Sequence, residues 1–160
     1  AGEAPAASPV DVGPAAAAHL DATIVVYHSG WEAGVAEGAY DASKPAGDQR
    51  GVDRLLASLD DAGIGSNGNV YAELGSTWFN LARSLDDAAH VLGKLLLHLG
   101  PERILWGTDS IWYGSPQGQI DAFRAFAISD QFQERFGYPV LTDETKRLIL
   151  GDNAVRLYGL

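Results

Sequence analysis

The stretch Arg103-Ile-Leu-Trp-Gly-Thr-Asp109-Ser-Ile-Trp112 decides the fold class, because a short apolar run stops there at a carboxylate and opens into a loop. An apolar run of this length, entered from Gly100 and Pro101, predicts a strand buried on both faces, as in a parallel sheet. Ligands of α/β proteins bind at the carboxyl ends of such strands. Asp109 therefore indicates a site, although an Asp that only caps a strand-to-loop turn gives the same local pattern.

Two further stretches repeat this pattern, at residues 23–31 and 69–78. Each is a short β-rich run followed by an ionisable residue, small polar residues and a tryptophan. Across the three stretches the ionisable residues are His28, Glu73 and Asp109, and the tryptophans are Trp31, Trp78 and Trp112. Because parallel strands end at the same edge of a sheet, we expect the three ionisable side chains to converge there.

The composition narrows the class of partner. A length of 160 residues with 46% hydrophobic residues fits one domain with a sizeable core. The net charge of −10 argues against a nucleic-acid or anionic-membrane surface. The absence of Cys excludes disulfides, thiolate zinc sites and cysteine nucleophiles. No membrane-spanning stretch or signal peptide is visible, so we expect a cytoplasmic location.

The order of elements predicts an α/β fold with a parallel sheet. We expect residues 1–9, which are rich in Ala, Pro and Ser, to be a flexible lead-in, and residues 10–160 to form one domain. The expected strands are residues 22–28, 69–74 and 103–109. The expected helices are residues 9–20, 50–62, 84–99, 117–136, 142–150 and 153–160. Three strands leave two open apolar edges, so we expect the native protein to contain more strands than this chain supplies.

The three strand ends also resemble a known family. Val26-Tyr-His28-Ser-Gly-Trp31, Val70-Tyr-Ala-Glu73-Leu-Gly and Arg103-Ile-Leu-Trp-Gly-Thr-Asp109, with the tail at residues 150–158, resemble the amidohydrolase superfamily. The similarity is to its amidohydrolase-2 branch, which includes the aminocarboxymuconate-semialdehyde decarboxylase-like enzymes. It implies that residues 10–160 are the C-terminal part, strands six to eight, of a (β/α)₈ TIM barrel. Such barrels need about 250 residues, so the domain is expected to be incomplete.

The resemblance also implies roles for individual residues. In the family, the carboxylate at the Asp109 position ligates a metal and accepts a proton from the attacking water. The histidine at the His28 position ligates the metal or acts as general base and electrophile. The implied cofactor is a divalent ion, expected to be Zn²⁺. The paired histidines of the family's first strand and the ligand of its fifth strand have no counterpart in this chain. The residues expected to contact a substrate are Glu73, Trp31, Trp78, Trp112 and Ser110.

Each of these assignments has a structural alternative. His28 can be a core histidine that is satisfied by the backbone, and the tryptophans can simply pack the loops at the strand ends. Glu73 can orient His28, contact substrate, or form a buried ion pair with Arg103 or Arg83.

The predicted function is that of a metal-dependent hydrolase or non-oxidative decarboxylase that acts on a small molecule through Asp109 and His28. The alternative is a non-catalytic half-barrel that serves as an interaction or assembly subunit. In either case the expected partner is the missing barrel half or a second copy of the chain. A nucleotide-binding domain is disfavoured, because no Gly-rich phosphate loop follows any of the strands.

Overall fold

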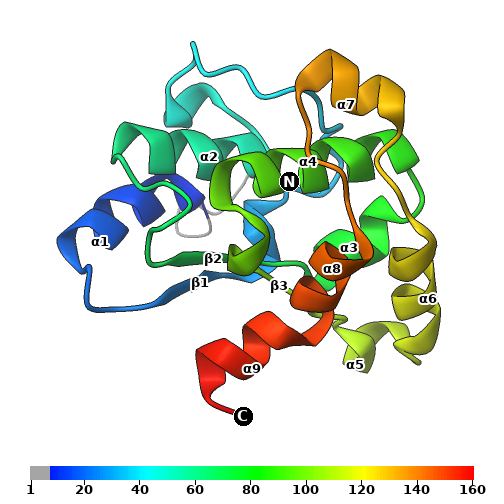
Figure 1. Cartoon of the computed structure of the whole chain (residues 1–160). Coiled ribbons are helices and arrows are strands. Elements are labelled where there is room, and N and C mark those ends of the chain that lie inside the picture. The colour runs from blue at the N-terminus through cyan, green and yellow to red at the C-terminus, as the bar shows by residue number, and fades with distance from the viewer. Residues whose placement is uncertain (1–7) are drawn as a thin grey trace.

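The computed structural model describes residues 8–160, and a three-stranded parallel sheet lies at its centre (Figure 1). The strands are β1 (Ile24–Val26), β2 (Val70–Glu73) and β3 (Ile104–Leu105), in the order β1-β2-β3. Val26 pairs with Ala72, and Ala72 pairs with Ile104. The predicted α/β fold with three parallel strands is confirmed, although each strand is shorter than predicted. Except for Ser8 and Pro9, the predicted lead-in lies outside the described residues.

Helices fill the connections between the strands and follow β3. They are α1 (Val12–Ala18), α2 (Val52–Asp61), α3 (Gly75–Leu81), α4 (Leu85–Leu99), α5 (Ser110–Tyr113), α6 (Gln117–Ala125), α7 (Asp130–Phe136), α8 (Asp143–Arg147) and α9 (Asn153–Tyr158). A π-helical turn, Leu148–Asp152, joins α8 to α9. Within residues 8–160, every helix is too short or too polar to cross a bilayer.

The single helix predicted at residues 117–136 is wrong, because the structure forms α6 and α7 with an extended segment between them. Phe126 has φ −68° and ψ 144°, and both Phe126 and Ile128 are buried. Residues two apart point to the same side in extended backbone but to different sides of a helix, so the break lets both side chains reach the core. Ser129 then caps α7 by accepting a hydrogen bond from Phe132 N–H at 3.4 Å.

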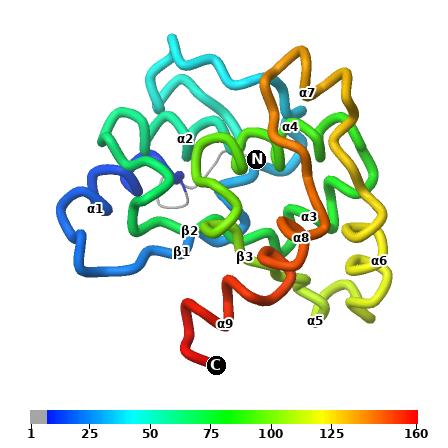
Figure 2. Tube along the Cα trace, in the orientation of Figure 1, coloured from blue at the N-terminus to red at the C-terminus, as the bar shows by residue number. Residues whose placement is uncertain are grey.

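The two faces of the sheet have different environments. One face carries Val26, Ala72 and Ile104, which belong to the hydrophobic core together with leucines of α2 and α4. Figure 1 shows α2 and α4 on that side of the sheet. The other face carries Val25, which is 37% exposed, and Tyr71, whose ring is covered by the Arg103 guanidinium. Figure 2 traces the chain from β3 through α6 and α7 back to β3, where Trp106 N–H bonds to Ile149 O at 3.1 Å.

A buried cation anchors the long segment between β1 and α2. Lys94 on α4 is 1% exposed, and its Nζ lies 2.7 Å from Glu37 Oε2 and 2.5 Å from Asp53 Oδ1. Burial raises the pKa of Glu37, against the opposing effect of Lys94. The other oxygen of Glu37 accepts Val52 N–H at 3.1 Å, at the first residue of α2. The carboxylate of Glu37 therefore ties this segment to two helices.

Trp78 belongs to the core and not to a loop at the strand ends, contrary to the sequence prediction. A helix, α3, begins directly after β2, and it places Trp78 where only 1% of the residue is exposed. The indole Nε1–H donates to Gln119 O at 3.0 Å. The ring meets Phe123 and Phe126 edge to face, at centroid distances of 5.0 and 5.6 Å. These contacts join α3 to the segment after β3.

We expect Trp78→Ala to lower the free energy of unfolding by about 3–5 kcal/mol, the usual cost of removing a buried aromatic side chain. Trp112 is 75% exposed and supplies a matched control. Trp112→Ala should change the same quantity by less than about 0.5 kcal/mol. Urea unfolding followed by circular dichroism measures both values, and equal losses in the two variants would contradict the placement of Trp78.

Tyr138 packs against α4 at Gly93, where an added Cβ would come within 2.3 Å of the tyrosine ring. Tyr138 is 5% exposed, and its hydroxyl lies 2.8 Å from His90 Nδ1. Burial raises the pKa of Tyr138 to about 12, and the charges of Asp53 and Glu37 add to the effect. Since an unfolded tyrosine titrates near pH 10, the stabilisation from neutral Tyr138 is complete below about pH 10. It is lost as the pH rises through the folded-state pKa.

We therefore expect the free energy of unfolding to fall more steeply above about pH 10 in the wild type than in Tyr138→Phe, which has no phenol to ionise. Urea unfolding at half-unit steps of pH measures both slopes. Parallel curves for the two proteins would show that Tyr138 is not buried as described.

Candidate functional site

The structure brings together the three ionisable residues that follow the strands. His28 Nε2 lies 3.2 Å from Asp109 Oδ2, and His28 Nδ1 lies 3.5 Å from Glu73 Oε2. Their side chains are largely buried, with exposed fractions of 23% for His28, 15% for Glu73 and 13% for Asp109. The predicted convergence at the carboxyl edge of the sheet is confirmed.

The backbone at this edge is strained. His28 has φ 55° and ψ 22°, Ser29 has φ 55° and ψ 21°, and Asp109 has φ 48° and ψ 33°. Among residues 8–160 these are the only non-glycine residues with positive φ. Left-handed backbone costs an L-residue about 1–2 kcal/mol, so the rest of the fold must hold these residues in place. Strain of this kind concentrates at functional sites.

The side chain of Glu73 holds the strained turn by bonding to the backbone of His28. Its Oε2 accepts His28 N–H at 3.0 Å, and its Oε1 accepts Gly75 N–H at 2.6 Å. Glycine at position 107 makes room for this carboxylate, because a Cβ there would lie 1.6 Å from Oε1. The carboxylate thus bonds to two main-chain donors.

The suggested ion pair of Glu73 with an arginine is wrong. The Arg103 guanidinium lies over the Tyr71 ring, 4.8 Å from its centroid, and the Arg83 guanidinium lies over the Phe79 ring at 5.1 Å. Of the proposed alternatives, the observed contacts are those of a residue that positions His28.

Asp109 accepts hydrogen bonds from two hydroxyl groups besides its contact with His28. Its Oδ1 accepts from Tyr27 OH at 3.1 Å, and its Oδ2 accepts from Ser76 Oγ at 2.6 Å. Desolvation and the hydrogen bond to Asp109 raise the pKa of Tyr27. Tyr113 OH lies 2.8 Å from Ser76 Oγ and extends this network toward α5. Tyr27 and Ser76 were not predicted, although Tyr27 directly precedes His28 and Ser76 lies three residues after Glu73.

The remaining residues predicted to bind a substrate are divided between two regions. Ser110 is half-buried beside Asp109, and its N–H bonds to Thr108 Oγ1 at 3.3 Å. Trp31 is half-buried against the core, and Trp112 is exposed on α5. Trp78 points away from the converging residues.

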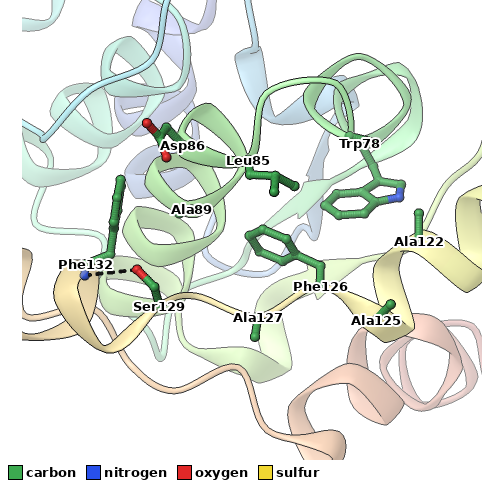
Figure 3. Close-up of a pocket in the computed structure, with 11 residues that line it drawn as sticks. Trp78, Leu85, Asp86, Ala89, Ala122, Ala125, Phe126, Ala127, Ser129 and Phe132 are labelled. Atoms are coloured by element: carbon green, nitrogen blue, oxygen red, sulfur yellow. Dashed lines mark hydrogen bonds between the residues drawn. The ribbon is translucent and has the colours of Figure 1, made fainter.

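Trp78 instead lines an apolar cavity of about 420 Å³ between α4 and the α6–α7 segment (Figure 3). Figure 3 shows Phe126 and Leu85 beside it. The cavity is lined by none of the three converging residues, so it is separate from the site at the strand ends.

The side chains present do not complete a metal site by themselves. A catalytic zinc ion has three protein ligands, and residues 8–160 contain no group of three or more His, Asp or Glu side chains that is able to hold a metal ion. Asp109 offers a suitable anionic oxygen. His28 fits less well, because its Nδ1 accepts Ser76 N–H at 3.1 Å. A neutral ring with an unprotonated Nδ1 carries its proton on Nε2, which is the nitrogen that faces Asp109.

The chain has a parallel sheet, and a histidine and a carboxylate are in contact beyond the strand ends. These features place it among the α/β proteins that carry their site at the carboxyl ends of the strands. Within this class, residues 3–160 match the family model described as amidohydrolase, of the amidohydrolase-2 type. The chain therefore belongs to the amidohydrolase family, as the resemblance predicted. The comparison with curated proteins gave no match.

Two crystal structures of an amidohydrolase from Burkholderia multivorans are similar to the chain. The structure with bound zinc is 19% identical, has a TM-score of 0.50, and aligns with 95% of this chain and 49% of its own. The structure with bound HEPES is 19% identical, has a TM-score of 0.49, and aligns with 95% and 50%. The chain thus spans about half the length of the solved structures that it matches.

We expect Asp109→Gly to be more stable than Asp109→Ala by about 1 kcal/mol, because both variants lack the carboxylate but only glycine adopts the left-handed backbone at no cost. Urea unfolding of the two variants isolates the strain from the loss of the side chain. Equal stability, or a more stable alanine variant, would show that the backbone at position 109 is relaxed.

Proposed function

We propose that this chain forms the C-terminal arc, strands six to eight, of a (β/α)₈ barrel that hydrolyses or decarboxylates a small molecule. Membership of the amidohydrolase family supports this proposal, and so does the similarity to half of a longer amidohydrolase chain. The half-exposed Val25 on β1, an edge strand of a sheet with only three strands, is what an excerpt of a closed barrel would show.

The observation that carries the proposal is the contact of 3.2 Å between His28 Nε2 and Asp109 Oδ2, made by two residues with strained backbone. A histidine and a carboxylate in contact can exchange a proton with a bound molecule. In hydrolysis, Asp109 would take a proton from the attacking water, and His28 would deliver one to the leaving group. In decarboxylation, the same pair would protonate the carbon that loses carboxylate.

We further propose that the complete site holds a divalent metal ion, with Zn²⁺ as the expected ion. The similar amidohydrolase structure from Burkholderia multivorans contains bound zinc. Asp109 would hold the metal, which when bound would polarise the substrate or acidify a water molecule. We assign His28 to proton transfer and not to ligation, because its Nδ1 accepts Ser76 N–H. The other ligands would come from the missing part of the barrel.

A second candidate function is that of a non-catalytic assembly subunit. The incomplete set of metal ligands in residues 8–160 favours it for the chain in isolation. Ile111 and Leu160, each 84% exposed, would supply apolar contacts to a partner. Metal analysis of the purified chain separates the two candidates, because bound stoichiometric zinc would contradict a purely structural role.

We expect His28→Asn and Asp109→Asn each to lower turnover by at least about 100-fold, the usual contribution of a positioned acid or base. The assay covers esters, lactones and amides, together with release of CO₂ from unsaturated carboxylic acids. The matched controls are His19→Asn and Asp48→Asn, which change exposed residues that are outside the hydrogen-bond network of His28, Glu73 and Asp109. Full turnover in either site variant would refute the assignment.

A further inference from the structure

We infer that Ser76 is a positioning residue that fixes the proton of His28 on Nε2 and directs it toward Asp109. The inference rests on the proposed function for its catalytic meaning. Its structural content, the tautomer of one histidine, is measurable without any substrate.

The backbone of Ser76 determines which nitrogen of His28 carries the proton. Ser76 is the second residue of α3, and an N–H in the first turn of a helix has no partner inside the helix. This N–H instead donates to His28 Nδ1 at 3.1 Å. A donor can only meet a lone pair, so Nδ1 is unprotonated and the neutral ring has its hydrogen on Nε2.

The hydroxyl of Ser76 gives the network a single direction. Ser76 Oγ donates its one hydrogen to Asp109 Oδ2 at 2.6 Å, so in its contact with Tyr113 OH at 2.8 Å it must be the acceptor. Tyr27 OH donates to the other oxygen of Asp109. The hydroxyl hydrogens of Tyr27 and Ser76 therefore both point toward Asp109, and His28 Nε2 lies 3.2 Å from Asp109 Oδ2.

This arrangement separates the roles of the two carboxylates. Glu73 Oε2 lies 3.5 Å from His28 Nδ1, but Nδ1 has no hydrogen to donate to it. Glu73 therefore acts on His28 through the backbone N–H of that residue. Ser76 performs the orienting task that a carboxylate performs on many catalytic histidines, and it selects the opposite tautomer.

Nitrogen-15 NMR of histidine-labelled protein, at a pH of about 8.5 where an ordinary imidazole is neutral, reads the tautomer directly. The signal that disappears in His28→Asn identifies His28 among the four histidines of the chain. We expect the Nε2–H form in the wild type and in Ser76→Ala, which retains the backbone donor. We expect Ser76→Pro, which lacks that N–H, to shift His28 toward the Nδ1–H form.

Proline is tolerated in the first turn of a helix, and the amide fingerprint of Ser76→Pro checks that the variant is folded. The carbonyl of Ser76, which accepts Asn80 Nδ2 at 2.7 Å, is present in every variant. An Nδ1–H tautomer in the wild type would overturn the inference whether or not the proline variant folds. An unchanged tautomer in a folded Ser76→Pro would overturn it as well.

Kinetics then connect the tautomer to the proposed function. We expect Ser76→Ala to lower kcat roughly 10- to 100-fold with a small change in KM, and Ser76→Thr, which keeps both donors, to recover most of that loss. If His28→Asn retains full activity while the wild-type tautomer is Nε2–H, the proposed function fails and the positioning by Ser76 stands. Full activity in Ser76→Ala would overturn the catalytic part of the inference.

Discussion

The carboxylate of Glu73 is the constraint on which the site depends. One oxygen accepts the N–H of His28 and the other accepts the N–H of Gly75, so a single side chain joins the turn after β1 to the start of α3. The first bond holds His28 in left-handed backbone, and the second sets the direction in which α3 leaves the sheet. Because Ser76 follows Gly75, the same bond also places the N–H and hydroxyl that meet His28 and Asp109. The positions of His28 and Ser76 therefore both depend on the carboxylate of Glu73 on the central strand.

The strained backbone of the site also depends on packing elsewhere in the fold. Three residues with left-handed backbone cost several kcal/mol between them, a large share of the stability of a single domain. Packing must offset that cost: the buried Trp78 ties α3 to the segment after β3, and the Lys94–Glu37 pair ties α4 to the segment after β1. A strained turn persists only where the surrounding structure leaves it no relaxed alternative.

The sequence predicts well which ionisable residues meet beyond the strands, because an apolar run and an ionisable residue after it are local signals. It does not predict the conformations of His28 and Asp109, since left-handed backbone at a non-glycine residue depends on distant hydrogen bonds. The contribution of Ser76 is hidden as well, because a backbone N–H is present at almost every position. The sequence does not predict the burial of Trp78, because the short helix α3 directly after β2 carries no strong helical pattern. It does not predict the break at Phe126 either, because helical spacing does not say which of several aromatic residues reach the core.

The converging side chains lie at one end of the sheet, and the position before Glu73 on the same face of β2 is already covered. The ring of Tyr71 on β2 is covered by the guanidinium of Arg103, at the start of β3. Glu73, two residues further along β2, is largely buried, and the absence of a side chain at position 107 makes room for its carboxylate. Because the strands run parallel, the ionisable residues His28, Glu73 and Asp109 all lie at the same edge of the sheet.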